Sequence, residues 1–132
     1  MTVGLVLVSH SARLAEGARE LAEQVAQGAV PILAVGGAAE GSLGTNALAI
    51  VDAVTSLREV DGVLVLVDLG SAVMSAETAL EELPAERRQH VRLADAPFVE
   101  GTMAAAVEAS MGSGLDAVLG AAESARGQAK LA

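Results

Sequence analysis

His10 is the residue of this sequence best placed to do chemistry. It stands one residue beyond an apolar run, Val3 to Val8, which carries no charge and is typical of a strand buried on both faces of a parallel sheet. Ligands bind outside the carboxyl ends of such strands. Histidine is also the side chain whose ordinary pKa lies nearest to neutral pH. We therefore predict a functional imidazole; the alternative is a ring that only bonds a backbone carbonyl and packs.

Asp68 is the second candidate, because it ends another apolar run, Val63 to Val67. A carboxylate at the end of a buried strand needs a partner to offset its lost hydration. If it accepts a hydrogen bond from one imidazole nitrogen, it fixes the tautomer and leaves the other nitrogen free as a nucleophile. We therefore predict that Asp68 orients His10, with an ordinary helix N-cap as the alternative. His90, the other histidine, lies in the charged connection PAERRQHVR and is expected on the surface.

Glycines and hydroxyls lie in the same strand-end loops. Backbone N–H groups in such loops, with the positive end of a helix beginning near Ser71, form a cradle of the size of a phosphoryl group. The loops match no nucleotide-binding fingerprint, since GxxxxGK[ST] is absent and AVGGAAEGSLG is not GxGxxG. The candidate phosphoryl-binding residues are Ser11, Gly36, Gly37, Gly70 and Ser71.

Apolar runs alternate with amphipathic stretches along the whole chain, which predicts βαβ units. Strands are expected at 3–8, 32–35 and 63–67, with a short one at 91–93. The predicted fold is α/β: a three-layer, doubly wound sandwich around a mostly parallel sheet of four or five strands. The 132 residues suit one domain, 1–132. In the first helical stretch an apolar stripe recurs at helical spacing and should face the core: Leu14, Ala18, Leu21, Ala22 and Val25. In the second we expect Leu48, Val51 and Val54 to face in.

The composition narrows the classes of partner. The net charge of −9 argues against sequence-independent binding to nucleic acid or to an anionic membrane, and favours a protein partner with a basic face. There are no cysteines, and the N-terminal apolar run is shorter than a secretory h-region. We therefore expect a soluble cytoplasmic protein. Only one residue, Phe98, is aromatic, so the core must rely on aliphatic packing between closely approached elements.

Three segments carry a family resemblance: GLVLVSHSARLAEGARELA, GGAAEGSLGTNALAI and GVLVLVDLGSAVMSAE. Over about residues 3 to 110 the chain resembles the DhaM family, the phosphocarrier subunits of dihydroxyacetone kinases driven by the phosphoenolpyruvate:sugar phosphotransferase system. This family is similar to the enzyme IIA domains of mannose-type sugar transporters. The resemblance implies that the phosphorylated histidine falls on His10 and its orienting acid on Asp68. The phosphate-facing backbone and hydroxyl of the third loop fall on Gly70 and Ser71.

The resemblance implies a phosphotransferase that works as a relay. His10 takes a phosphoryl group from HPr and passes it to ADP on the ADP-binding kinase subunit, and the ATP formed phosphorylates dihydroxyacetone on the dihydroxyacetone-binding subunit. No cofactor or metal is expected on this chain, because ADP belongs to the partner. Some relatives carry fused HPr-like and enzyme I-like domains, for which this chain has no room, so a separate HPr is expected.

The resemblance also implies a symmetric homodimer. An apolar stripe on one expected helix could pair with its own copy across a two-fold axis. Its residues are Val99, Met103, Val107 and Met111. The alternative is that this stripe packs against the chain's own sheet.

Three other functions stay open at this stage. The first is the enzyme IIA component of a mannose-type sugar transporter, which shares the architecture. The second is a small α/β metal-handling protein that uses His10 with acidic ligands, although the chain has two histidines and no HxxxH or HExxH spacing. The third is a regulatory module that binds an anion without covalent chemistry. A mass shift of one phosphoryl group would separate the relay from the last two.

Overall fold

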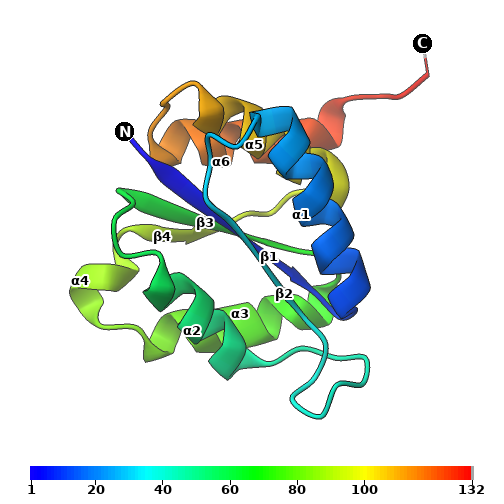
Figure 1. Cartoon of the computed structure of the whole chain (residues 1–132), viewed down its shortest axis with the longest axis vertical. Coiled ribbons are helices and arrows are strands. Elements are labelled where there is room, and N and C mark those ends of the chain that lie inside the picture. The colour runs from blue at the N-terminus through cyan, green and yellow to red at the C-terminus, as the bar shows by residue number, and fades with distance from the viewer. Residues whose placement is uncertain (132) are drawn as a thin grey trace.

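The computed structural model describes residues 1–131; Ala132, the last residue of the predicted single domain, lies outside the described residues. A parallel sheet of four strands in the order β2-β1-β3-β4 forms the centre (Figure 1). The strands are β1 (Val3–Ser9), β2 (Ile32–Gly36), β3 (Gly62–Val67) and β4 (Val91–Leu93). Each strand predicted from the sequence is present.

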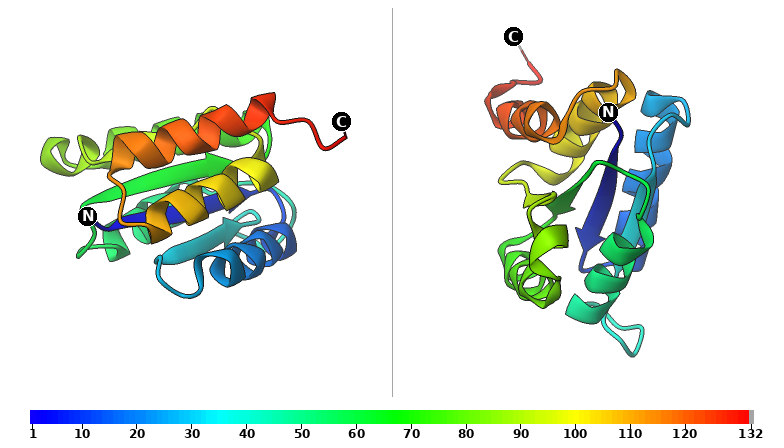
Figure 2. Two further views of the ribbon diagram at one scale, coloured as in Figure 1. Left: turned by 90° about the horizontal axis from the view of Figure 1, so that it is seen from above. Right: turned by 90° about the vertical axis from the view of Figure 1, so that its left-hand side faces the viewer.

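Helices cover both faces of the sheet and make three layers (Figure 2). On one face lie α1 (Ala12–Ala26), α5 (Phe98–Ser110) and α6 (Leu115–Ser124). On the other lie α2 (Ala47–Ser56) and α3 (Gly70–Glu82). The short α4 (Ala85–Arg88) leads into β4, and a 3₁₀ turn, η1 (Ala125–Gly127), follows α6. The predicted doubly wound α/β sandwich is confirmed.

The two central strands carry no polar side chain before Ser9, at the end of β1, because both of their faces are covered. Successive side chains of a strand point to opposite faces. In β1, Leu5 and Leu7 therefore enter the core under α1 and α5, whereas Val6 and Val8 enter the core with α2 and α3. All residues of β1 and β3 are buried. No helix among residues 1–131 is long and apolar enough to cross a membrane.

Alanines, and not the large apolar residues, form the inner face of α1. The helix buries Ala15, Ala18, Ala22 and Ala26. The expectation that Leu14 and Leu21 face the core is wrong, because both are exposed. Small side chains allow the helix axis to approach the sheet closely, and this geometry places the leucines outside.

The expected faces of two further helices are only partly correct. On α2, Val54 is buried as expected together with Ile50, but Leu48 is exposed. On α5 the alternative that the stripe packs on the chain's own sheet is wrong for Val99, Val107 and Met111, which are exposed. The buried face of α5 consists of Phe98, Gly101, Thr102, Ala105, Ala106 and Ala109.

The strand order puts the functional loops together. From β1 the chain moves outward to β2, and it then returns across β1 to form β3 on its other side. The loops after β1 and β3 therefore diverge from adjacent strand ends, which is the topological switch point where open α/β sheets bind ligands. His10 and Asp68 both lie at this point.

The close approach of β2 to the start of α1 gives a stability prediction. A Cβ atom on Gly36 would lie 2.6 Å from the Ser11 carbonyl oxygen and 2.7 Å from Ala12 Cα, and these backbone atoms have little freedom to move. We expect Gly36→Ala to lower the free energy of unfolding by about 1–3 kcal/mol, measured by urea denaturation.

The matched control is Gly17→Ala, at an exposed position of α1 where an added Cβ meets nothing within 4 Å. This change should raise the free energy of unfolding by about 0.5–1 kcal/mol through helix propensity. Equal effects of the two substitutions would contradict the predicted crowding at Gly36.

Candidate functional site

Adjacent parallel strands bring His10 and Asp68 into contact. Val8 of β1 pairs with Val67 of β3, and the N–H of Asp68 donates to the Val8 carbonyl oxygen at 3.1 Å. The next residues therefore leave the sheet side by side. The distance from His10 Nδ1 to Asp68 Oδ1 is 2.9 Å. The structure thus brings together the two side chains that the sequence predicts as a pair.

Four donors hold the carboxylate of Asp68. Its Oδ2 accepts from the Ser9 hydroxyl at 2.8 Å and from the His10 backbone N–H at 3.0 Å. Its Oδ1 accepts from the Leu69 N–H at 2.8 Å and faces the imidazole. Leu69, and not Asp68, occupies the N-cap position of α3, so the alternative reading of Asp68 as an ordinary N-cap is wrong.

The protonation of Asp68 follows from these contacts. Its side chain is only 8% exposed, and burial by itself would raise the pKa. The hydrogen bonds from the His10 backbone and ring and from the Ser9 hydroxyl outweigh burial, and the pKa of Asp68 lies below its ordinary value. An ionised carboxylate can only accept, so Nδ1 of His10 carries a proton and the lone pair of a neutral ring lies on Nε2.

The free nitrogen of His10 faces the first turn of α3. Nε2 is in contact with the Ser71 hydroxyl, and the imidazole is 24% exposed. Gly70 and Ser71 are the first two residues of α3, and N–H groups in the first turn of a helix have no intrahelical partner. A Cβ atom on Gly70 would meet nothing within 4 Å, so the space around it is open. This arrangement suits an anionic group attached to Nε2.

The loop that carries His10 contains Ser11 and lies against Gly36 and Gly37 at the end of β2. The hydroxyl of Ser11 caps α1 by accepting from the Leu14 N–H at 3.2 Å. The N–H of Gly37 donates to the Ser9 carbonyl oxygen at 3.4 Å, and Gly36 packs on the backbone of Ser11. Their role as phosphoryl-binding residues stays a prediction.

The structure adds two features that are not among the candidate residues proposed from the sequence. Ser9 is completely buried and bonds Asp68, and its signal was a polar residue at the end of an apolar strand. The hydroxyls of Thr45 and Ser75 lie 2.6 Å apart and join the loop before α2 to α3. No sequence pattern marks that second pair.

His90 lies at the opposite edge of the sheet, next to the start of β3, and is exposed as expected. Within residues 1–131 no three His, Cys, Asp or Glu side chains are grouped so that they could hold a metal ion. The metal-handling hypothesis therefore lacks a ligand set in this part of the chain.

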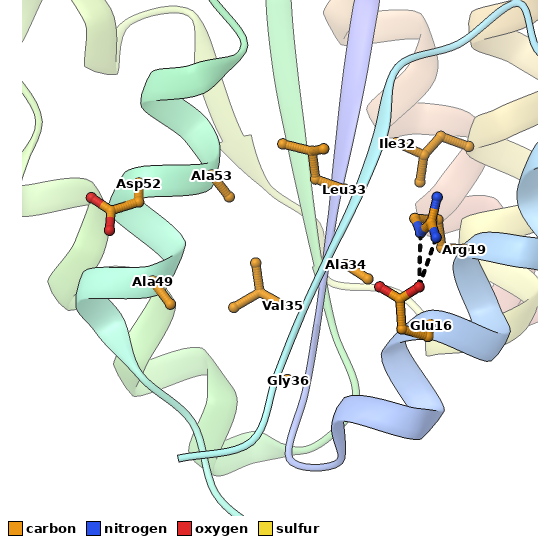
Figure 3. A pocket seen from close by; sticks show the side chains of 10 residues that line it. All are labelled: Glu16, Arg19, Ile32, Leu33, Ala34, Val35, Gly36, Ala49, Asp52 and Ala53. Atoms are coloured by element: carbon orange, nitrogen blue, oxygen red, sulfur yellow. Dashed lines mark hydrogen bonds and ion pairs between the residues drawn. The ribbon is translucent and has the colours of Figure 1, made fainter. Parts of the chain in front are cut away.

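A groove of about 500 Å³ follows the open edge of β2 (Figure 3). Its one basic residue, Arg19, is paired with Glu16 and Glu23 at 2.7 Å each. Its lining contains no histidine. A second cavity, of about 360 Å³, includes Asp68 and Gly70 in its wall. His10 lines neither cavity, and we assign the site instead by the contacts of the His10 ring with Asp68 and Ser71.

The fold and the site match a known family. The family model for PTS system fructose IIA components matches residues 4–119, and the chain belongs to this family. The crystal structure of the unknown function protein EF1359 has the same fold, with a TM-score of 0.86, 36% sequence identity, and coverage of 93% of this chain and 94% of that one.

Relatives with assigned roles are dihydroxyacetone kinase subunits. The chain is 45% identical over 120 residues to the PEP-dependent dihydroxyacetone kinase, phosphoryl donor subunit DhaM, of Escherichia coli, covering 89% of this chain and 25% of that protein. It is 39% identical to the corresponding subunit of kinase 2 of Listeria innocua, covering 89% and 94%. The chain thus spans a quarter of the first relative and nearly all of the second. The resemblance to the DhaM family is confirmed.

The lowered pKa of Asp68 predicts how stability depends on pH. The ionised carboxylate stabilises the folded chain above the ordinary pKa of 3.8, and this contribution is lost as the pH falls through the lower folded-state value. Asp68→Asn should therefore lower the free energy of unfolding by about 1–3 kcal/mol near neutral pH, because an amide cannot accept all four hydrogen bonds.

Urea denaturation from about pH 7 to pH 2 would measure this difference, which should shrink below pH 3.8. The control is Asp52→Asn, an exposed residue of α2, which should change stability by less than about 0.5 kcal/mol. A difference for Asp68→Asn that stays constant with pH would contradict the prediction.

Proposed function

We propose that this chain is a phosphohistidine carrier that takes a phosphoryl group from HPr and passes it to ADP on the ADP-binding subunit of a dihydroxyacetone kinase. The observation that carries the proposal is the fixed imidazole: Asp68 holds Nδ1, and Nε2 points at the N-terminus of α3. The names of the relatives, phosphoryl donor subunits of dihydroxyacetone kinases, favour this acceptor over a sugar transporter.

In the first step, the Nε2 lone pair of His10 attacks the phosphorus of the HPr phosphohistidine. The new P–Nε2 bond forms as the P–N bond to HPr breaks, and the electron pair of that bond returns to the HPr ring. Nδ1 keeps its proton, and the carboxylate of Asp68 stabilises the positive charge that develops on the imidazole. The Ser71 hydroxyl must leave Nε2, and it can then donate to a phosphoryl oxygen.

In the second step, a terminal phosphate oxygen of ADP attacks the same phosphorus and the P–Nε2 bond breaks. The kinase subunits bind ADP and dihydroxyacetone, so this chain needs no cofactor or metal of its own. Its contribution is to position the nucleophile and to supply N–H and O–H donors to the phosphoryl group. This reaction is that of a phosphoenolpyruvate–glycerone phosphotransferase, and we place it in the cytoplasm with its partners.

Exposed apolar side chains near the carboxyl edge of the sheet support docking of protein partners. They are Leu43, Leu48, Leu69 and Met74, on the loops and the first two turns of helices that follow strand ends. The first turns of α1, α2 and α3 carry no acidic residue, although the chain as a whole has a net charge of −9. A partner that brings an anionic phosphoryl group therefore meets little repulsion there.

The first test of the function is phosphorylation of His10. Incubation with phosphoenolpyruvate, enzyme I and HPr should add the mass of one phosphoryl group to the parent chain and none to His10→Ala, because no other imidazole lies at the site. His90→Ala is the control and should accept the group like the parent, since His90 lies at the opposite edge of the sheet. A phosphorylated His10→Ala chain would refute the assignment of the carrier, and an unmodified parent chain would refute the function.

We also propose that the chain forms a homodimer through α5. Val99, Val107 and Met111 are exposed, and Met103 is half-buried against the core. Exposed apolar side chains in a row along one helix suit a self-complementary contact about a two-fold axis.

Light scattering should give twice the chain mass of 13.1 kDa for the parent and a single chain mass for Val107→Glu, because a charge in an apolar contact is costly. Leu21→Glu is the control, because Leu21 is equally exposed but lies on α1. A dimeric Val107→Glu variant would place the interface on another face, and a monomeric parent would exclude the dimer.

A further inference from the structure

Ser9 lies at the end of β1 with no exposed surface, in contact with both residues of the proposed relay. Its hydroxyl donates to Asp68 Oδ2 at 2.8 Å. It also accepts from the Ser11 N–H at 3.0 Å. One buried hydroxyl therefore links the carboxylate to the loop on the other side of His10.

The direction of these hydrogen bonds is fixed by chemistry. A backbone N–H can only donate, so the Ser11 bond uses a lone pair of the Ser9 oxygen. An ionised carboxylate can only accept, so the hydroxyl proton must point at Asp68. Ser9 consequently has one orientation in which both partners are satisfied, and burial prevents water from replacing either bond.

We propose that Ser9 is a positioning residue of the relay: its hydroxyl holds the Asp68 carboxylate so that Oδ1 faces Nδ1 of His10 and the ring keeps its lone pair on Nε2. This inference rests on the proposed function for its kinetic consequence. Its structural consequence, the tautomer of His10, is independent of that function.

The geometry at the carboxylate explains why the hydroxyl matters. Oδ2 has two donors, the Ser9 hydroxyl and the His10 N–H, and only the hydroxyl belongs to a side chain. Without it, the Ser11 N–H loses its acceptor and Oδ2 keeps one bond. With three of its four hydrogen bonds left, the carboxylate is held less firmly, and the acceptor of the Nδ1–H form of His10 is less well fixed.

The test uses the full chain labelled with ¹⁵N and three variants. Ring ¹⁵N shifts at about pH 8, where an ordinary histidine is neutral, should show the Nδ1–H tautomer in the parent. They should show a mixture with Nε2–H in Ser9→Ala. The rate of phosphoryl transfer from HPr should fall about 10- to 100-fold in Ser9→Ala, the effect of losing a group that orients a functional histidine. The KM for HPr should stay unchanged, because a buried side chain does not contact the partner.

Ser9→Thr keeps the hydroxyl and should restore both the tautomer and the rate. Thr102→Val is the matched control, since Thr102 is equally buried and its hydroxyl has no hydrogen-bond partner within residues 1–131. This control should leave tautomer and rate as in the parent. If Ser9→Ala does not fold, Ser9→Cys, which keeps the volume but donates weakly, should shift the tautomer in the same direction.

A parent-like tautomer in folded Ser9→Ala or Ser9→Cys would overturn the proposal. A parent-like rate in the same variant would do so as well. If HPr fails to phosphorylate the parent chain, the proposed function fails, and the ring ¹⁵N shifts still decide the role of Ser9.

Discussion

The buried carboxylate of Asp68 is the constraint on which the site depends. A charge that is 8% exposed requires donors, and all four come from residues adjoining it along the chain or across the sheet: Ser9 once, His10 twice and Leu69 once. They can reach it only because β1 and β3 are adjacent and end at the same level, with Val8 beside Val67. A strand inserted between them would separate the pair by about 5 Å more and leave the charge unsatisfied. The strand order is thus a requirement of the chemistry.

The alanine-based helix faces connect the packing to the surface. Because α1 and α3 approach the sheet through alanines, the core needs few large side chains from its helices. Leu21 on α1 and Met74 on α3 are therefore left outside the core. Exposed apolar residues of this kind can form a contact surface without weakening the core, because they contribute little to it. The close approach leaves no room for a side chain at Gly36, where the backbone of β2 lies against that of α1.

Sequence patterns predicted the strands well and the helix faces poorly, for a physical reason. In a chain where strands and helices alternate, a short apolar run such as Val63 to Val67 predicts a strand. Because the carboxyl ends of parallel strands lie at the same edge of the sheet, His10 and Asp68 were then expected to lie together. On α1, alanines and leucines both recur at helical spacing, and periodicity alone does not decide which stripe meets the sheet. Hydrophobicity favoured Leu14 and Leu21, but close packing favoured alanine. The sequence assigns Ser9 no role, although it lies in the loop of interest, because its role depends on a partner 59 positions away.

In the proposed relay His10 must release the phosphoryl group that it accepts, and the groups around its ring suit this requirement. Within residues 1–131 the groups bonded to the His10 ring are one carboxylate and one hydroxyl, and neither is a cation. A guanidinium or ammonium on the phosphoryl group would stabilise the phosphorylated state as well as the transition states on either side of it. Such uniform stabilisation gives no gain in transfer rate. Neutral donors from Ser71 and the first turn of α3 stabilise the anion more weakly. In the proposed relay, Asp68 stabilises the imidazole and also keeps a negative charge near the phosphoryl group, which favours its departure.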